Sequence, residues 1–270
     1  MNDAIDIVIA GIGIWSPEVR TWEAAVAAFC GNVEIDANAA SRPAPSVLPP
    51  TERRRAPESV LLGVEAAQQA CEMANVAAKD LPHVFASSYG ELGINDYLCE
   101  TLANAPLEVS PIRFHNSVHN APAGYWAIAT GCTQSSTAIS AGDATFGAGF
   151  LETALIVAAS GQPALLSAYD VAAIGPLRDV VACDSKLGIG LVLAKNHAAP
   201  VATLRVRHGI DSAPPRLASG RSVLHASHHE NPAARGLDLL QAIARKESGV
   251  IRIAAGPRLV LDVEILPWSM

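Results

Sequence analysis

Residues 115–160 read HNSVHNAPAGYWAIATGCTQSSTAISAGDATFGAGFLETALIVAAS, and the interpretation of the whole chain depends on this stretch. An apolar run at 125–129 is followed, after a Thr-Gly pair, by Cys132. We expect this run to be a strand, residues 133–149 to form a buried helix of small side chains, and residues 154–159 to form a second strand. Cys132 would then lie at a strand-to-helix turn, where unpaired N–H groups and the helix dipole stabilise a thiolate nucleophile. The alternative is a small, buried and inert side chain.

The segment IATGCTQSSTAI, residues 128–139, resembles the nucleophile elbow of the β-ketoacyl synthases of the thiolase superfamily. Three further segments resemble the same family: SPIRFHNSVHNAPAG before the elbow, ALIVAA after it, and IVIAGIGIWSP near the N-terminus. Together the similarity covers most of residues 5–195. It implies an α/β fold made of a single thiolase-type half, in which a five-stranded mixed sheet carries helices on both faces, plus a short C-terminal extension.

The second half of a complete ketosynthase is not visible in the sequence. Full-length members carry a pseudo-symmetric half with two catalytic histidines, in a His-Gly-Thr-type and an Asn-Phe-Gly-type motif, and neither motif follows Cys132. The chain therefore resembles the shortened ketosynthase-like chain-length factors of aryl polyene-type clusters. This resemblance implies a ketosynthase-like N-terminal half at residues 1–206. Residues 207–270 would be a C-terminal extension that packs on the same domain and covers a sheet edge.

Three kinds of function are compatible with these residues. A condensing enzyme needs a thiolate to carry the acyl chain, donors for the thioester oxyanion, and histidines that promote decarboxylation. Because no such histidine motif is found, we expect a non-catalytic chain-length factor subunit that pairs with a full β-ketoacyl synthase in fatty acid or polyketide (aryl polyene) biosynthesis and helps to form the acyl tunnel. The alternative is a cysteine-dependent acyltransferase or condensing enzyme that uses Cys132 as nucleophile, with His115 or His119 as base. A scaffold without a pocket is the third possibility.

The resemblance also implies which residues lie at the tunnel or at the partner interface. Six are expected there: Thr133, Gln134, Phe146, His115, Asn116 and His119. The last three belong to the segment that resembles the family's loop and partner-contact region. For them we expect structural or interface hydrogen bonds.

Residues 51–55, Thr-Glu-Arg-Arg-Arg, form the densest positive patch of the chain. Such a run is ordinarily a solvated helix start. Its functional interpretation is a transient contact of Arg53, Arg54 and Arg55 with an acidic acyl carrier protein, because opposite charges accelerate and orient encounter.

The composition excludes several classes of protein. A net charge of −7 argues against a nucleic-acid binder, which would show a basic footprint. No apolar run reaches the length of roughly 18 residues needed to span a membrane, and no metal or cofactor is expected. Five widely spaced cysteines form neither a disulfide framework nor a zinc pattern, which favours a reducing cytoplasm: Cys30, Cys71, Cys99, Cys132 and Cys183.

The remaining pattern predicts the other elements. Strands are expected at 5–15, 83–88, 187–193, 201–206 and 258–266, helices at 21–30, 57–74, 94–104 and 236–246, and an irregular connection at 36–50. The strands at 187–193 and 201–206 are expected to pair with each other. His225, His228 and His229 have a spacing that could bind zinc on a helix, but no fourth ligand is found, and a polar surface is the expected role.

Overall fold

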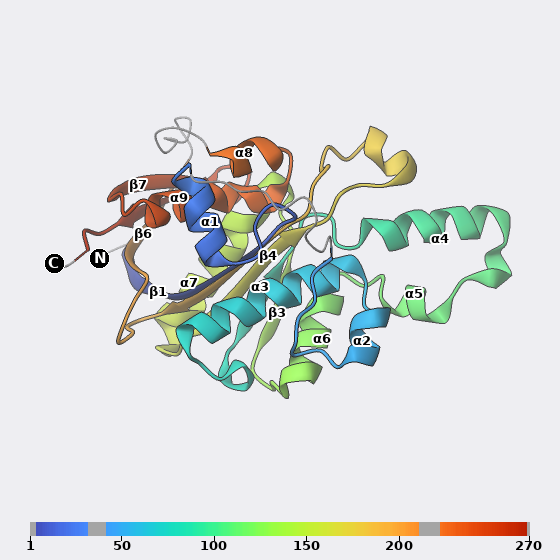
Figure 1. The fold of residues 1–270 in the computed structure, drawn as a ribbon, viewed down its shortest axis with the longest axis horizontal. Coiled ribbons are helices and arrows are strands. Elements are labelled where there is room, and N and C mark those ends of the chain that lie inside the picture. The colour runs from blue at the N-terminus through green and yellow to red at the C-terminus, as the bar shows by residue number, and fades with distance from the viewer. Residues whose placement is uncertain (1–3, 32–41, 211–221, 269–270) are drawn as a thin grey trace.

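The computed structural model describes residues 4–31, 42–210 and 222–268, in which helices pack on an eight-stranded sheet (Figure 1). The strands are β1 Ala4–Trp15, β2 His83–Ala86, β3 Ser136–Ile139, β4 Ala164–Asp170, β5 Leu187–Ala194, β6 Ala202–Ile210, β7 Gly249–Ala254 and β8 Leu259–Ile265. The α-helices are α1 Trp22–Phe29, α2 Pro50–Arg55, α3 Glu58–Ala74, α4 Leu92–Asn104, α5 Pro111–His115, α6 Ala121–Thr130, α7 Thr145–Ser160, α8 Val223–Ser227 and α9 Leu237–Ala244.

The strands follow the order β3-β2-β4-β5-β1-β6-β8-β7 across the sheet. β2 pairs in parallel with β3 and β4, and the other pairs of described strands are antiparallel. The expected α/β class with a mixed sheet is confirmed, but the sheet has eight strands rather than five. The expectation that residues 187–193 and 201–206 pair with each other is wrong, because β1 lies between β5 and β6.

β1 is the strand predicted from its continuous apolar run, and it is buried on both faces. Helix α3 lies so close to β1 that a side chain at Gly11 or Gly13 would collide with the carbonyl oxygens of Ala70 or Ala66. Glycine is therefore required at both positions, because only a residue without Cβ allows the two backbones to approach this far.

Each face of the sheet has its own apolar cluster. Helices α3 and α6 cover one face and enclose large side chains such as Phe85, Trp126 and Tyr169. The opposite face is covered by α7 together with α1, α8 and α9, and it holds the larger cluster. The expectation of helices on both faces is confirmed. In the described part of the chain, no helix has the length and apolar content needed to cross a membrane.

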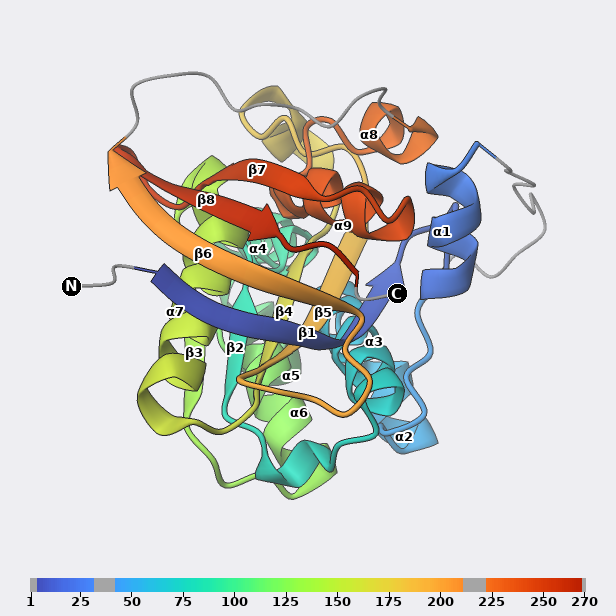
Figure 2. The ribbon, with the colours of Figure 1, turned by 90° about the vertical axis from the view of Figure 1, so that its left-hand side faces the viewer.

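The C-terminal part, residues 222–268, is called the tail here. Its strands β8 and β7 continue the sheet beyond β6, as Figure 2 shows. Thirteen of its apolar side chains, among them Leu240 and Val263, belong to the cluster around α7. The expected boundary between residues 206 and 207 falls inside β6. The tail therefore shares both the sheet and the core of the preceding residues.

The central stretch folds differently from the prediction. Residues 125–129 lie in helix α6 rather than in a strand, and residues 154–159 lie in helix α7. The expected helix at 133–149 instead contains β3 and a short 3₁₀ turn before α7 begins. Gly131 ends α6 in the left-handed conformation, with φ of 67°. The prediction failed because a short apolar run has no periodicity that separates a buried strand from a buried helix.

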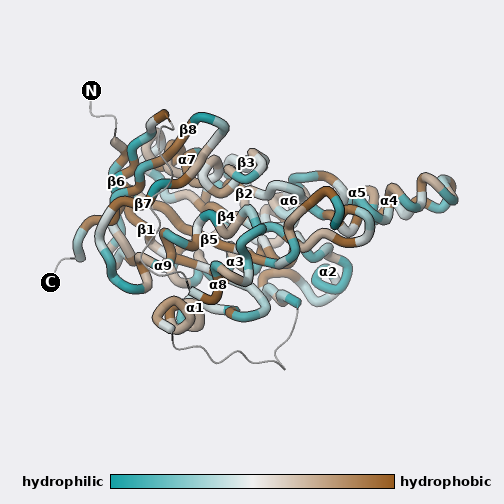
Figure 3. Tube along the Cα trace, turned by 90° about the horizontal axis from the view of Figure 1, so that it is seen from above, coloured by the Kyte–Doolittle hydropathy of each residue, from teal (hydrophilic) through white to brown (hydrophobic). Residues whose placement is uncertain are grey.

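Helices α4 and α5 project from the body of the molecule as an arm, defined here as residues 92–115 (Figures 1 and 3). The helix expected at 94–104 is confirmed as α4. The helices expected at 21–30, 57–74 and 236–246 are confirmed as α1, α3 and α9. Of the irregular connection expected at 36–50, residues 36–41 lie outside the described residues.

Candidate functional site

The strand-to-helix turn that the sequence analysis assigned to Cys132 lies farther along the chain. Parallel strand β3 ends at Ile139, residues 140–144 form the turn, and α7 follows. Gly142 has φ of 57°, and the exposed side chains here are Ser140 and Asp143. In open α/β sheets, sites form at the carboxyl ends of parallel strands. This turn therefore has the expected position, but it carries no thiol.

Cys132 lies at the opposite end of the same strands. Its Sγ donates to the carbonyl oxygen of Leu81 at 3.4 Å and lies 3.7 Å from Nδ1 of His83, the first residue of β2. Cys132 also follows the C-terminal end of α6, because its N–H donates to Ala127 at 2.9 Å. A helix C-terminus has the dipole sign that disfavours a thiolate. The expected placement of Cys132 at a helix start is therefore wrong.

His83 is the titratable side chain that lies within hydrogen-bond distance of the Cys132 sulfur. It is fully buried, and its Nε2 has no hydrogen-bond partner. Burial lowers the pKa of the imidazole, which is therefore neutral at physiological pH. A neutral imidazole gives no charge stabilisation to a thiolate.

The carboxyl ends of β2 and β4 hold a buried polar cluster around Asp170. One carboxylate oxygen, Oδ1, accepts hydrogen bonds from the Ser87 hydroxyl at 2.8 Å, Ser88 N–H at 3.0 Å and Tyr89 N–H at 3.1 Å. Burial raises the pKa of Asp170 to about 7, although these donors act in the opposite direction. The sequence analysis missed this residue. The signal was an acidic residue at the end of a mostly apolar stretch, residues 164–170.

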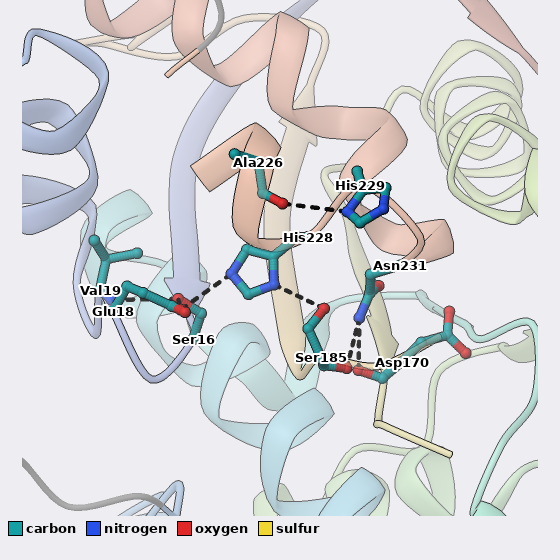
Figure 4. Close-up of polar contacts among 9 residues, drawn as sticks. All are labelled: Ser16, Glu18, Val19, Asp170, Ser185, Ala226, His228, His229 and Asn231. Atoms are coloured by element: carbon teal, nitrogen blue, oxygen red, sulfur yellow. Dashed lines mark hydrogen bonds and ion pairs between the residues drawn. The ribbon is translucent and has the colours of Figure 1, made fainter. Parts of the chain in front are cut away.

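The tail reaches the same end of the sheet through a second network, drawn in Figure 4. Asn231 donates from Nδ2 to the backbone oxygens of Asp170 at 3.2 Å and of Ser185 at 3.0 Å. His228 lies beside it, with Nδ1 at 2.9 Å from the Ser185 hydroxyl and Nε2 at 3.1 Å from Glu18. The hydrogen bond from His228 lowers the pKa of Glu18 to about 2. These contacts connect the tail to the turn after β1.

The expected polar surface at the three histidines is wrong for two of them. His228 is fully buried, and His225 is 8 % exposed, between the Ser222 hydroxyl and the Asp238 carboxylate, each at 3.0 Å. Only His229 is exposed. No group of three or more metal-ligating side chains with suitable geometry is found among the residues that the structure describes.

The residues expected at the tunnel or interface are not gathered in one place. Thr133 and Gln134 are exposed in the connection before β3. Phe146 is fully buried instead, stacked on Phe150 and in contact with Gly236 of the tail. A tunnel lined by Phe146 would have to pass through this core.

The three upstream residues lie near the base of the arm. His115 is exposed, whereas Asn116 is buried and accepts a hydrogen bond from the Tyr125 hydroxyl at 3.2 Å. His119 is half-buried, with Nε2 at 2.8 Å from the Ser87 carbonyl oxygen. His115 and Asn116 also line a groove of about 520 Å³ between residues 47–52 and helices α5 and α6.

The arginine patch lies on α2, beside this groove. As the pattern predicted, residues 51–55 belong to a short helix, and none of its side chains is buried. Arg53 donates to the Ala44 carbonyl oxygen at 3.3 Å, while Arg54 and Arg55 are exposed. Glu52 of the same helix lines the groove.

Exposed apolar side chains gather on the arm. They are Leu102 at 58 %, Leu107 at 100 %, Ile112 at 58 % and Phe114 at 65 % exposure. Edge strand β3 is half-exposed to exposed along its length and pairs on one side with β2. Contiguous exposed apolar surface and an open strand edge are features of interaction surfaces.

The family assignment follows from the sequence as a whole. The family model described as "Beta-ketoacyl synthase, N-terminal domain" matches residues 30–255. The chain belongs to this family. The match extends well into the tail of this ketosynthase-family protein, in agreement with the shared sheet and core. No curated protein matches the chain in sequence.

Solved structures of the same fold span the full chain. A chain of the ketosynthase ApeO in complex with its chain length factor ApeC, from Xenorhabdus doucetiae, is 20 % identical with a TM-score of 0.69, covering 96 % of this chain and 99 % of that one. The ishigamide ketosynthase/chain length factor is 16 % identical with a TM-score of 0.68, covering 98 % and 100 %. AntDE:AntF, a type II polyketide acyl carrier protein in complex with its ketosynthase bound to the hexaketide, is 12 % identical with a TM-score of 0.74, covering 97 % and 99 %. At these identities the likeness establishes the fold.

Proposed function

We propose that this chain is a non-condensing, chain-length-factor-type subunit that pairs with a full β-ketoacyl synthase and helps to form its acyl tunnel, in aryl polyene-type polyketide or fatty acid biosynthesis. The observation that carries the proposal is the turn between β3 and α7. It stands at the carboxyl end of a parallel strand, where the family fold would hold a nucleophile, and residues 140–144 contain no cysteine. A subunit of this fold without a nucleophile there acts through its partner.

The surface supports a protein partner. The arm exposes Leu107 and Phe114, and β3 has an open edge, so both features offer groups that a second ketosynthase-type subunit would bury. Structures of similar fold include a ketosynthase with its chain length factor. In this proposal Thr133, Gln134 and His115 belong to the interface, because they are exposed on the segments next to β3 and the arm.

A transient acyl carrier protein is the second proposed partner. Arg54 and Arg55 are exposed on α2, and the rest of the chain is acidic enough to give a net charge of −7. A local cationic patch on an acidic protein directs an acidic partner to that patch. We place this complex in the cytoplasm, since all five cysteines are unpaired thiols.

One observation favours the alternative in which Cys132 performs acyl chemistry. Its sulfur lies 3.7 Å from His83 Nδ1, which is a distance that a thiol–imidazole pair can have. Both side chains are buried, so a substrate would have no open path to the sulfur in this conformation.

Co-expression with a full β-ketoacyl synthase from the same organism tests both functions. We expect the two proteins to copurify and to make a product of unchanged length when Cys132 is replaced in Cys132→Ala. Loss of activity in an intact complex would instead assign chemistry to Cys132. Failure to copurify, with both proteins folded, would refute the proposed pairing.

A further inference from the structure

The arm has almost no core of its own. Helix α4 buries only Leu92 and Ile94, both in its first turn, and α5 buries no side chain. Within the arm, the Tyr97 hydroxyl accepts from Ser110 N–H at 3.0 Å, and the Arg113 guanidinium lies 3.9 Å from the Tyr97 ring centre. These contacts join the two halves of the arm to each other. The arm is also held by contacts of α4 with residues 175–179 and by the hydrogen bond from Ser59 N–H to the Glu91 carboxylate at 2.9 Å. Otherwise the direction of the arm depends on its root, where the chain leaves and rejoins the body of the molecule.

The outgoing side of the root is the turn at residues 87–90. Its first three residues donate to the Asp170 carboxylate through the Ser87 hydroxyl and the backbone N–H groups of Ser88 and Tyr89. The Ser87 hydroxyl oxygen also accepts a hydrogen bond from Gly90 N–H at 2.9 Å, so the first and last residues of the turn are joined. One buried carboxylate therefore fixes three consecutive residues.

The returning side of the root is tied to the same turn. Nε2 of His119 lies 2.8 Å from the Ser87 carbonyl oxygen. Gly90 has φ of 65°, and a side chain added there would touch the His119 ring at 3.5 Å. Both ends of the arm thus meet at residues 87–90. Asp170 holds that turn from the β4 side, and on the β3 side Ser87 N–H donates to the Ile139 carbonyl oxygen at 3.1 Å and the Ser140 hydroxyl donates to the Ser88 carbonyl oxygen at 3.0 Å.

The position of Asp170 is fixed by strand β4 and by a hydrogen bond from the tail. It is the last residue of β4, is 1 % exposed, and its backbone oxygen accepts from Asn231 of the tail. No ion pair of its carboxylate is found in the described part of the chain. The donors of the turn are therefore the groups that replace water around it, and a buried carboxyl group that loses such donors is left unsatisfied, which costs more than an ordinary hydrogen bond contributes.

We propose that Asp170 is the positioning residue of the arm: by holding the turn at 87–90 it sets the direction in which the arm meets the partner ketosynthase. The inference rests on the proposed function for its second part, the effect on pairing. Its first part, the anchoring of the arm, concerns the isolated chain alone.

Hydrogen exchange of the isolated chain tests the first part. In Asp170→Ala we expect backbone amides of residues 88–115 to exchange at least tenfold faster, while those of β1 and β5 keep their protection. Asp170→Asn retains one carbonyl oxygen for the same donors and is expected to restore most of the protection. The matched control is Ser167→Ala in the same strand, which removes a buried hydroxyl that donates to Gly63 and is remote from the root. Equal exchange in Asp170→Ala and the wild type, or equal acceleration in Ser167→Ala, would overturn the anchor.

The dissociation constant for the partner ketosynthase tests the second part of the proposal, the effect of Asp170 on pairing. We expect a rise of at least tenfold in Asp170→Ala, partial recovery in Asp170→Asn and no change in Ser167→Ala. If Asp170→Ala does not fold, Ser87→Ala takes its place and is expected to show the same pattern at smaller amplitude. A loosened arm with unchanged affinity would refute the link to pairing while the anchor stands. No binding by the wild type would refute the proposed function itself.

Discussion

The arm and the tail are both additions to the central sheet, and they treat their apolar side chains in opposite ways. The tail places its apolar residues in the core around α7, and its buried His228 contacts the partly exposed Glu18 in the turn after β1. The arm leaves Leu107 fully exposed and Phe114 at 65 %. The tail is therefore complete within this chain. The arm presents apolar surface that no other part of the described residues buries.

Under the proposed function, this difference separates residues that stabilise the isolated chain from residues that bind the partner. Apolar burial in the tail contributes to folding of the isolated chain, at roughly 25 cal/mol per Å² of apolar surface removed from water. The exposed apolar surface of the arm contributes nothing until a partner covers it. Substitutions in the tail should therefore change the stability of the isolated chain, and substitutions in the arm should change partner binding.

The largest effect is expected in the tail. Glu18→Ala leaves the fully buried His228 ring without this hydrogen-bond partner, and the free energy of unfolding should fall by about 3 kcal/mol, the upper end for a buried polar group left unsatisfied. Urea unfolding of the isolated chain measures it. Replacement of the exposed neighbour, His229→Ala, is the control and should change stability by less than about 0.5 kcal/mol. Equal effects of both variants would contradict the role assigned to the pair.

Asp170 contacts both the root of the arm and the tail, and its contribution to the unfolding free energy should depend on pH. Burial raises the pKa of Asp170 from 3.8 to about 7, so the folded state binds this proton more tightly than the unfolded state. Its contribution is present below pH 3.8 and is lost as the pH rises to about 7. Between pH 5 and pH 8 the wild type should lose about 2–3 kcal/mol more unfolding free energy than Asp170→Asn, at roughly 1.4 kcal/mol per unit. Parallel pH profiles of the two proteins would show that Asp170 does not titrate in this range.

The arm should matter for pairing and not for folding. In the double variant Leu107→Ser with Phe114→Ser, the dissociation constant for the ketosynthase should rise tenfold or more, about 1.4 kcal/mol, as expected when central apolar contacts are lost. The unfolding free energy of the isolated chain should change by less than about 0.5 kcal/mol. Val250→Ser, at an exposed apolar position on the far sheet edge, serves as the control for both measurements. If the arm variant destabilises the isolated chain, the arm contributes to folding as the tail does, and the proposed difference between them is wrong.

The smallest effect is expected on α2. Arg55→Glu should slow association with the acyl carrier protein severalfold at low salt, and the difference should vanish as salt screens the charges. Stopped-flow rates at two ionic strengths measure it. The matched variant Arg258→Glu changes the net charge equally at an exposed position outside α2, and it should leave the rate near that of the wild type. A comparable slowing by both would indicate that net charge matters, and not this patch.

Much of the fold could be predicted from local pattern. The type of β1 follows from its long, β-branched apolar run, and the types of helices α3 and α9 and of the final strand β8 follow from their periodicity. The stretch around Cys132 could not be assigned in this way, because its small apolar residues suit a buried helix and a buried strand equally. Three elements were misassigned there, and as a result the expected nucleophile was placed at the wrong end of the sheet.

The polar interior was beyond the reach of sequence reasoning. Glu18 and His228 are separated by 210 positions, and nothing near either residue indicates that they meet 3.1 Å apart. Asp170 and Ser87 are 83 positions apart and are joined only because β2 and β4 are neighbouring parallel strands.

The sequence by itself determined the family, the α/β class and the elements whose side chains repeat with a clear period, because these depend on residues that are close along the chain. The tertiary structure alone decided which end of the sheet holds Cys132, which histidines are buried, and which apolar residues remain uncovered. The physical reason is that burial and hydrogen bonding of a side chain depend on strand order and packing. Those bring together residues whose separation along the chain carries no signal.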